Sequence, residues 1–322
     1  PPRSTLFPYT TLFRSRDCDG DLHTDNICLD DRVHIFDCIE FSDKFRFSDT
    51  AADVAFLAMD LESHGRLDLS NLFVSKYVEL TGDRGLLGVL PLYLANRAFI
   101  RGKVASLCID DPGMEPEAKI AAADRAARYF RLSRGYLLRH RLAKTLFITS
   151  GPSGCGKSTL ASELCFQLGM MHLSSDMERK RMAGVGEAER GHDIYGGYWD
   201  RRTYERLSEI AADELNQGHS VLVDATFRTR AARSVFSSIA GNSGASFAVI
   251  RPLCSDETAR RNIEARAAAG NSPSDGTWAV YQAQMADYEP PSEEEGILIN
   301  LESGGSAPEM VDTVLYELGL LV

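Results

Sequence analysis

The sequence predicts a mainly helical region over residues 16–142 and an α/β domain over residues 143–322, in which helices flank a parallel sheet. Between Thr50 and His140, apolar residues recur at three- and four-residue spacing, which is typical of amphipathic helices. After Lys144, short apolar runs alternate with helical stretches, which is typical of βαβ units. At 322 residues, the chain is long enough for two domains with separate cores.

Each element is suggested by a local pattern. Two apolar runs flank "DDR" within residues 26–41, which predicts a hairpin because such a turn signal joins paired strands. The helical stretches that follow are residues 50–65, 70–83, 86–107 and 116–141. The apolar runs that predict strands in the second region are "TLFITSG", "MMHLSS", "SVLVDATF", "SFAVIRPLC" and "GILINL".

The composition limits the classes of partner. A net charge of −11 argues against general binding to nucleic acids or membrane surfaces, since both require a basic face. No apolar run approaches the roughly 20 residues that span a bilayer. The cysteines are scattered and form no CxxC pair, so we expect reduced, mostly buried thiols rather than a zinc site, and a cytoplasmic location. They stand at positions 18, 28, 38, 108, 155, 165 and 254.

The clearest motif is "GPSGCGKS", which follows an apolar run and precedes an amphipathic stretch. Glycines in such a loop let backbone N–H groups surround nucleotide phosphates at a helix N-terminus. Lys157 is placed to reach the β- and γ-phosphates, and the Ser158 hydroxyl is placed to bind Mg²⁺. We therefore expect ATP and Mg²⁺ as cofactors, bound by Gly151, Gly154, Gly156, Lys157, Ser158 and Thr159.

Two carboxylates follow later apolar runs. Asp176 and Arg179 form a D-x-x-R pair at the end of "MMHLSS", where an open α/β sheet binds its ligands. There Asp176 could accept the proton of an attacking hydroxyl, and Arg179 could bind an anionic group; a helix cap with a surface arginine is the alternative. Asp224, at the end of "SVLVD", is expected to hold Mg²⁺ together with Ser158.

A third group lies on one predicted helix near the C-terminus. Arg260, Arg261 and Arg266 precede a Gly/Ser/Pro-rich stretch. If this helix closes over a nucleotide, Arg260 and Arg266 could contact the transferring phosphate, and the helix would exclude water. A solvated basic face explains the same pattern.

Together these motifs resemble those of small P-loop kinases, a group that includes polynucleotide 5′-hydroxyl kinases, zeta-toxin-like kinases and gluconate-type kinases. The resemblance covers residues 144–322 and implies that Asp176 is the catalytic base and that Arg179 contacts substrate or phosphate. It also implies that the segment 194–207 shapes the acceptor pocket, although packing explains its aromatic and basic residues equally well. The candidates there are Tyr195, Tyr198, Trp199, Arg201 and Arg202.

The first region carries a separate resemblance. "DGDLHTDN" resembles the H-G-D-x-H-x-x-N loop of aminoglycoside-phosphotransferase-like kinases, which implies that Asp21 is a base and that Asn26 and Asp37 bind Mg²⁺. Asp19 stands where that family has His. No glycine-rich cover or strand lysine precedes the motif, so we expect the helical C-lobe of such a phosphotransferase or protein-kinase-like fold, inactive by itself.

The order of the two regions resembles a bacterial family described as bifunctional aminoglycoside phosphotransferase/ATP-binding proteins. Thr5–Ser15 is also similar, letter for letter, to the conceptual translation of a sequencing adapter. We therefore expect residues 1–15 to be non-native and to pack poorly, rather than to form an edge strand. On this hypothesis the chain is an N-terminally truncated fragment, and Asp19 is either genuine or a sequence error for His.

Three functions remain in competition at this point. The first is phosphoryl transfer from ATP to a hydroxyl of a small molecule or nucleotide, by the second region. The second is a nucleotide-binding regulatory module without an acceptor, which needs the phosphate loop but no base at Asp176. The third is antibiotic phosphorylation by a full-length parent. The sequence identifies neither the acceptor nor the oligomeric state.

Overall fold

The computed structural model describes residues 14–186, 189, 194, 196–269, 276–302 and 304–321, and it omits the side chain of Lys44. The chain divides into two compact units. The first ends at His140 and also takes in Phe166–Gly169, and the second comprises Arg141–Cys165 and the residues from Met170 onward.

The first unit begins with short antiparallel pairs. Strand β1 (Ser15–Asp17) pairs with β4 (Phe47–Asp49), and β2 (Ile27–Leu29) pairs with β3 (Val33–Ile35). The hairpin predicted around "DDR" is confirmed by the second of these pairs. A short 3-10 turn, η1 (Thr24–Asn26), precedes β2.

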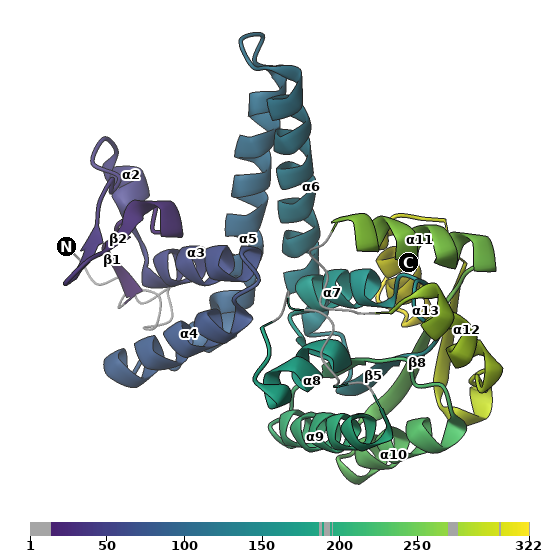
Figure 1. The fold of residues 1–322 in the computed structure, drawn as a ribbon. Helices are drawn as coiled ribbons and strands as arrows, with labels where there is room; N and C mark the ends of the chain where they lie inside the picture. Colours follow the sequence, from purple (N-terminus) through teal and green to yellow (C-terminus); the bar gives the residue numbers. More distant parts are fainter. Residues whose placement is uncertain are drawn as a thin grey trace. The chain divides into compact units, whose positions relative to one another are not determined.

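The predicted helical stretches of this unit are confirmed. They form α3 (Thr50–Ser63), α4 (Leu67–Thr81), α5 (Leu86–Leu107) and α6 (Pro116–Arg139), with the short α2 (Asp43–Arg46) before them. Helices α5 and α6 lie side by side along their length (Figure 1). The core of this unit includes Phe56 and Met59 of α3 and Leu132 of α6, which are fully or almost fully buried.

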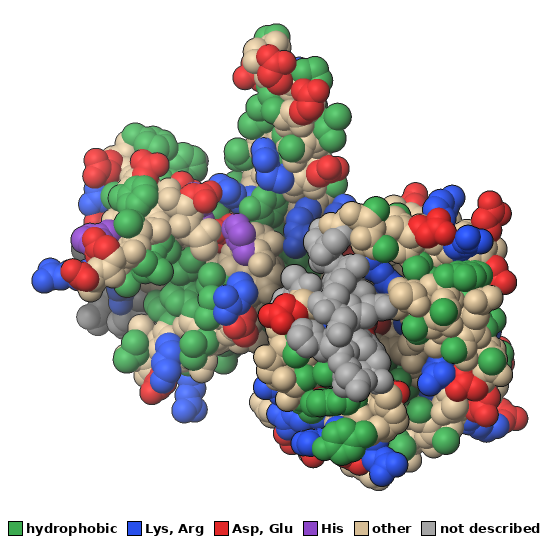
Figure 2. Space-filling view, in the orientation of Figure 1, with side chains coloured by type: hydrophobic (Ala, Val, Ile, Leu, Met, Phe, Trp, Pro, Cys, Tyr) green, Lys and Arg blue, Asp and Glu red, His purple; other side chains and the backbone are tan. Residues whose placement is uncertain are grey.

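Apolar side chains also remain on the surface of the first unit, as Figure 2 shows. Leu29, Phe41 and Leu80 are 75%, 83% and 84% exposed. Core packing therefore absorbs only part of this unit's apolar surface within the described residues.

At the start of this unit, Pro1–Phe13 lies outside the described residues. Ser15 pairs with Asp49 in the β1–β4 ladder, and Arg14 Nε lies 3.1 Å from Asp49 Oδ1. Arg14 thus has an ion-pair partner, whereas the strand that begins at Ser15 is exposed along its length.

The second unit is a five-stranded sheet with parallel pairing throughout, in the order β6-β7-β5-β8-β9. All five predicted strands are confirmed. The strands are β5 (Thr145–Thr149), β6 (Met171–Ser174), β7 (Val221–Asp224), β8 (Ser246–Leu253) and β9 (Ile297–Glu302). The helices are α7 (Lys157–Leu168), α8 (Ser175–Ala183), α9 (Gly197–Asn216), α10 (Arg230–Asn242), α11 (Asp256–Ala269), α12 (Trp278–Ala286) and α13 (Ala307–Glu317), with the 3-10 turn η3 (Glu293–Glu295).

Helices cover both faces of this sheet (Figure 1). Leu207 and Leu215 of α9 and Phe236 of α10 pack against alternate residues of the central strands, such as Ile148 and Val223. Helices α7 and α13 lie on the opposite face. Because successive side chains of a strand point to opposite faces, both faces of the central strand β5 are buried, as its unbroken apolar run predicts.

The cysteines differ from the expectation of reduced, mostly buried thiols. Cys155 and Cys254 form a disulfide, although 99 positions separate them. Cys28 and Cys38 are exposed, and Cys165 is the buried one among the free cysteines that the structure describes. The expectation of reduced thiols is therefore wrong for Cys155 and Cys254, and the expectation of burial is wrong for Cys28 and Cys38. Cys165 meets both expectations.

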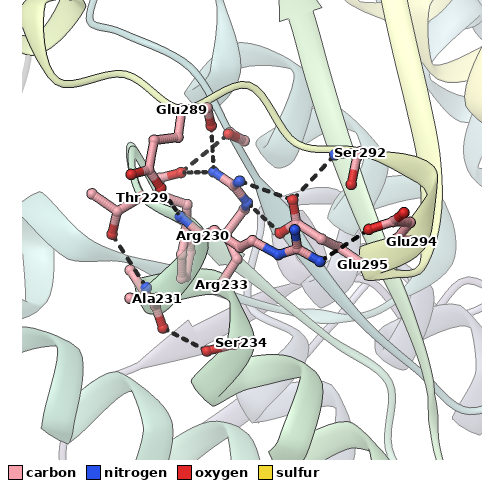
Figure 3. A network of polar contacts seen from close by, with 12 residues as sticks. Thr229, Arg230, Ala231, Arg233, Ser234, Glu289, Ser292, Glu294 and Glu295 are labelled. Atoms are coloured by element: carbon pink, nitrogen blue, oxygen red, sulfur yellow. Dashed lines mark hydrogen bonds and ion pairs between the residues drawn. The ribbon is translucent and has the colours of Figure 1, made fainter.

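A buried ion pair ties the segment before β9 to α10 (Figure 3). Arg233 donates from Nε and Nη2 to the two carboxylate oxygens of Glu295, at 2.7 and 2.9 Å. Its Nη1 donates to the carbonyl oxygens of Phe227 and Glu289. The side chains of Arg233 and Glu295 are 1% and 7% exposed. The nearby pair of Arg230 and Glu294, by contrast, is exposed.

We expect Arg233→Ala to lower the free energy of unfolding by about 3–5 kcal/mol, because it leaves a buried carboxylate unpaired. Arg230→Ala is the matched control and should cost less than about 1 kcal/mol, since its partner stays in solvent. Chemical denaturation of both variants measures the difference. Equal losses would contradict the assignment of Arg233 as the buried anchor.

The same pair gives a pH dependence of known sign. Burial raises the pKa of Glu295, but the hydrogen bonds and charge of Arg233 outweigh it and hold the pKa below its ordinary value of 4.5. The pair therefore contributes its full stability above that pH, and the contribution is lost as pH falls through the lower folded-state value. The stability difference between wild type and Glu295→Gln should shrink on acidification, in denaturation series at neutral and acidic pH; a pH-independent difference would refute this.

Candidate functional site

A cavity of about 1340 Å³ opens at the carboxyl ends of the parallel strands in the second unit. Its walls come from the loop between β5 and α7, the starts of α8 and α9, the loop after β7, and parts of α11 and α12. Strand β5 lies between β7 and β8, so the loop that follows it leaves the sheet where the chain order reverses. Ligands of open α/β sheets bind at this position.

The glycines of the β5–α7 loop adopt backbone angles that other residues avoid. The φ angles of Gly151, Gly154 and Gly156 are 142°, 87° and 79°. A Cβ on Gly154 would lie 2.7 Å from the carbonyl oxygen of Ala259 in α11. The loop therefore requires glycine at position 154 for two reasons, its positive φ angle and its close contact with α11.

Lys157 and Ser158 open α7 directly behind this loop. Lys157 is 9% exposed, and its Nζ donates to the carbonyl oxygen of Pro152 at 2.7 Å. Burial lowers the pKa of Lys157, while the charges of Asp224 and Asp176 act in the opposite direction. The ammonium group thus lies among carboxylates in the cavity, and Thr159 also lines it.

Asp224 ends β7 as the sequence predicts, and it is 3% exposed. Thr149 Oγ1 donates to its Oδ1 at 3.0 Å, and His172 Nε2 lies 3.5 Å from its Oδ2. Burial raises the pKa of Asp224, but His172, Lys157 and Ser158 outweigh it and keep the pKa below the ordinary value. An ionised carboxylate beside the Ser158 hydroxyl is the kind of hard oxygen donor set that Mg²⁺ prefers.

Asp176 lies in the first turn of α8, and Arg179 one turn later is 6% exposed. Arg179 Nη1 donates to Asp176 Oδ1, and its Nη2 donates to Asp200 Oδ1, both at 3.0 Å. The structure therefore brings the D-x-x-R pair into the cavity and adds Asp200, from the first turn of α9. The guanidinium group bridges two carboxylates and fixes the orientation of Asp176.

The predicted lid arginines have different positions. Arg266 lines the cavity and donates to the carbonyl oxygen of Gly276 at 2.9 Å. Arg260 is not among the residues that line the cavity; it pairs with Glu264 on the surface, with its side chain 61% exposed. Asn262, on the same helix, donates to the carbonyl oxygen of Gly154 at 2.8 Å.

Of the described candidates in the segment 194–207, one lies in the cavity. Arg201 lines the cavity, while Arg202 donates to the Tyr198 hydroxyl outside it, and Trp199 is not among the lining residues. Tyr195 lies outside the described residues. The lining also includes residues that sequence reasoning missed, namely His172, Asp200, Tyr204 and Arg228. A polar residue inside an apolar run was the available signal for His172.

In the first unit, Asn26 Nδ2 donates to the carbonyl oxygen and the Oδ2 of Asp21, at 3.1 and 3.3 Å. The structure thus brings together two of the three predicted residues. Asp37 is exposed and has a φ of 60°, two residues beyond the end of β3. Asp53 accepts hydrogen bonds from the backbone N–H groups of Asp19 and Gly20, which fixes the start of this loop without a histidine at position 19.

The sheet order, the glycine loop and the buried Lys157 and Asp224 define the second unit as an α/β P-loop nucleotide-binding domain. Residues 146–291 match the family of the AAA domain. The chain is also 31% identical over 285 residues to the uncharacterized protein Rv2004c of Mycobacterium tuberculosis; the matched region is 85% of this chain. The chain spans 54% of that relative's length.

The chain is also similar to solved structures. A gluconokinase from Sinorhizobium meliloti is 19% identical, with a TM-score of 0.40, over 54% of this chain and 91% of that one. The APS kinase CysC of Mycobacterium tuberculosis, solved with AMPPNP and APS, is 22% identical, with a TM-score of 0.40, over 55% of this chain and 98% of that one. Within the residues that the structure describes, no helix is both long and apolar enough to cross a membrane.

Gly154→Ala should weaken nucleotide binding by tenfold or more, about 1.4 kcal/mol, because the new methyl group would clash with the Ala259 carbonyl oxygen and distort the backbone N–H groups of the loop. Gly218→Ala is the matched control, since Gly218 has a φ of 91° but no neighbouring atom within 4 Å of the place that a methyl group would take. Both changes should cost about 1–3 kcal/mol of stability through backbone strain. Calorimetric titration with ATP distinguishes them, and equal affinities would contradict the role of the Gly154 contact.

Proposed function

We propose that the second unit is an ATP- and Mg²⁺-dependent kinase that transfers a phosphoryl group to a hydroxyl of a small molecule or nucleotide. The observation that carries this proposal is the Asp176 carboxylate, which lines the same cavity as the phosphate loop. A domain that only binds nucleotide has no need of a carboxylate at that place. The carboxylate supports transfer to an acceptor, which requires a base for the hydroxyl proton.

The nucleotide phosphates would bind to the backbone N–H groups of the loop from Gly151 to Ser158, at the N-terminus of α7. Lys157 would leave the Pro152 carbonyl, its partner here, to bind the β- and γ-phosphates. Ser158 and Asp224 would hold Mg²⁺, which supplies charge neutralisation for the transferring phosphoryl group when bound.

Asp176 would accept the proton of the acceptor hydroxyl as that oxygen attacks the γ-phosphorus. Arg179 keeps Asp176 oriented, and its second carboxylate partner, Asp200, prevents the guanidinium from swinging away. Arg266 extends from α11 into the cavity, where its charge would stabilise the transferring phosphoryl group. Arg201, Tyr204 and Arg228 also line the cavity, and on this proposal they would contact the acceptor.

For the first unit, we infer the helical lobe of a phosphotransferase-like fold. The support is local: Asp21 and Asn26 lie in hydrogen-bond contact on a loop that precedes a hairpin. In that fold Asp21 is the base and Asn26 and Asp37 bind the metal, as the resemblance implies. An assay with aminoglycosides on this chain joined to the part of a longer relative that it does not match tests that inference.

Asp176→Asn should reduce phosphoryl transfer by about 100-fold or more, because it removes the base and leaves the nucleotide site intact. Affinity for ATP should stay within about twofold. Glu178→Gln is the matched control, since Glu178 lies on the same helix but pairs with Arg181 outside the cavity.

The measurement is transfer of labelled phosphate from ATP to a panel of sugars, nucleosides and oligonucleotide 5′ ends. Transfer to no acceptor, together with ATP hydrolysis that is unchanged in Asp176→Asn, would rule out the kinase and favour a nucleotide-binding regulatory module. Loss of transfer in the Glu178→Gln control would show that the effect of the first variant is not specific to the base.

A further inference from the structure

The disulfide in the second unit joins the phosphate loop to the segment between β8 and α11. Cys155 is inside the phosphate loop, between Gly154 and Gly156, and is 7% exposed. Cys254 directly follows β8, and one residue, Ser255, separates it from α11. Their Cα atoms are 5.6 Å apart, which is inside the range that a disulfide spans without backbone movement.

The contacts around the disulfide connect the same two elements. Gly154 packs against the backbone of Ala259 in α11, and Asn262 of α11 donates to the Gly154 carbonyl oxygen. Cys254 packs with Trp278 against a small apolar cluster of Ala259, Ile263 and Tyr281. The phosphate loop and the first turns of α11 therefore meet at the disulfide, at a backbone contact and at a hydrogen bond.

We propose that Cys155 and Cys254 are a reversible redox pair whose oxidation controls nucleotide binding. In the disulfide form, the phosphate loop is fixed to the segment between β8 and α11. In the dithiol form, the backbone N–H groups of the loop are free to rearrange around phosphates, and α11, which carries Arg266, is free to move with them. The effect on nucleotides rests on the proposed function, whereas the pairing itself does not.

The oxidant is a small disulfide such as glutathione disulfide. Cys254 is the more accessible thiol, so its thiolate attacks the small disulfide and releases one thiol as a mixed disulfide forms. The Cys155 sulfur then attacks the Cys254 sulfur and releases the second thiol. Two protein thiols lose two electrons and two protons, and the small disulfide gains them.

The remaining cysteine of this unit does not share these features. Cys165 is buried on α7, and burial raises the pKa of its thiol, which makes the reactive thiolate scarce. It therefore offers a matched control. A redox response that belongs to the pair should disappear in Cys254→Ser and persist in Cys165→Ser.

The first experiment equilibrates the whole chain in glutathione redox buffers without nucleotide. Peptide mapping under non-reducing conditions should find a peptide that links Cys155 to Cys254, absent from Cys254→Ser. Glutathione adducts on separate cysteines, with no linked peptide, would overturn the pairing. This result does not depend on whether the protein is a kinase.

The second experiment measures binding of a fluorescent ATP analogue to the reduced and oxidised forms. We expect oxidation to weaken binding about tenfold, within the usual range of coupling between two sites, and a thiol reductant to restore it. Because coupling is reciprocal, saturating nucleotide should make the pair harder to oxidise by the same factor, a shift of about 30 mV for a two-electron couple.

If the linked peptide is present but the reduced and oxidised forms bind the ATP analogue with equal affinity, the proposal that oxidation controls nucleotide binding is overturned. The same conclusion would follow if Cys254→Ser still lost affinity in oxidising buffer. If the reduced protein bound no nucleotide at all, the proposed function would fail and the coupling with it, while the peptide map would still decide the pairing.

Discussion

The close approach of the phosphate loop to the backbone of α11 is the constraint on which the site depends. Gly154 has no room for a side chain, and its carbonyl oxygen is held by Asn262. At the start of the loop, the N–H group of Gly151 donates to the carbonyl oxygen of Thr226, after β7. The loop is therefore fixed between the segment after β7 and helix α11, and this placement brings Lys157 and Ser158 into the lining of the cavity.

Charge compensation is the second requirement, because the cavity buries groups that water would otherwise solvate. Lys157 lies among Asp224 and Asp176, and Arg179 bridges Asp176 and Asp200. The charges of Lys157 and Arg179 are thus compensated by carboxylates, and compensation is the condition under which a protein tolerates such burial. A nucleotide with its metal would exchange one set of partners for another without leaving a buried charge alone.

The sequence predicted the elements of this fold because their signals are local. The phosphate loop, the five strands and the D-x-x-R pair each occupy one continuous stretch of chain. Asp200 could not be found in this way, since its role comes from the packing of α9 beside α8, 21 positions after Arg179. The same holds for Cys155 and Cys254, whose spacing of 99 residues matches no motif.

Phe227 shows how residues outside the cavity determine its shape. Its φ of 40° is rare for a bulky residue and costs about 1–3 kcal/mol. Tyr204 accepts a hydrogen bond from its N–H group, and Arg233 donates to its carbonyl oxygen.

Its ring also packs edge-on against Phe236. These contacts offset the strain, and the Arg233 guanidinium is held in turn by Glu295. The loop that carries Thr226 and Arg228 into the cavity therefore depends on an ion pair between α10 and the segment before β9, neither of whose residues lines the cavity.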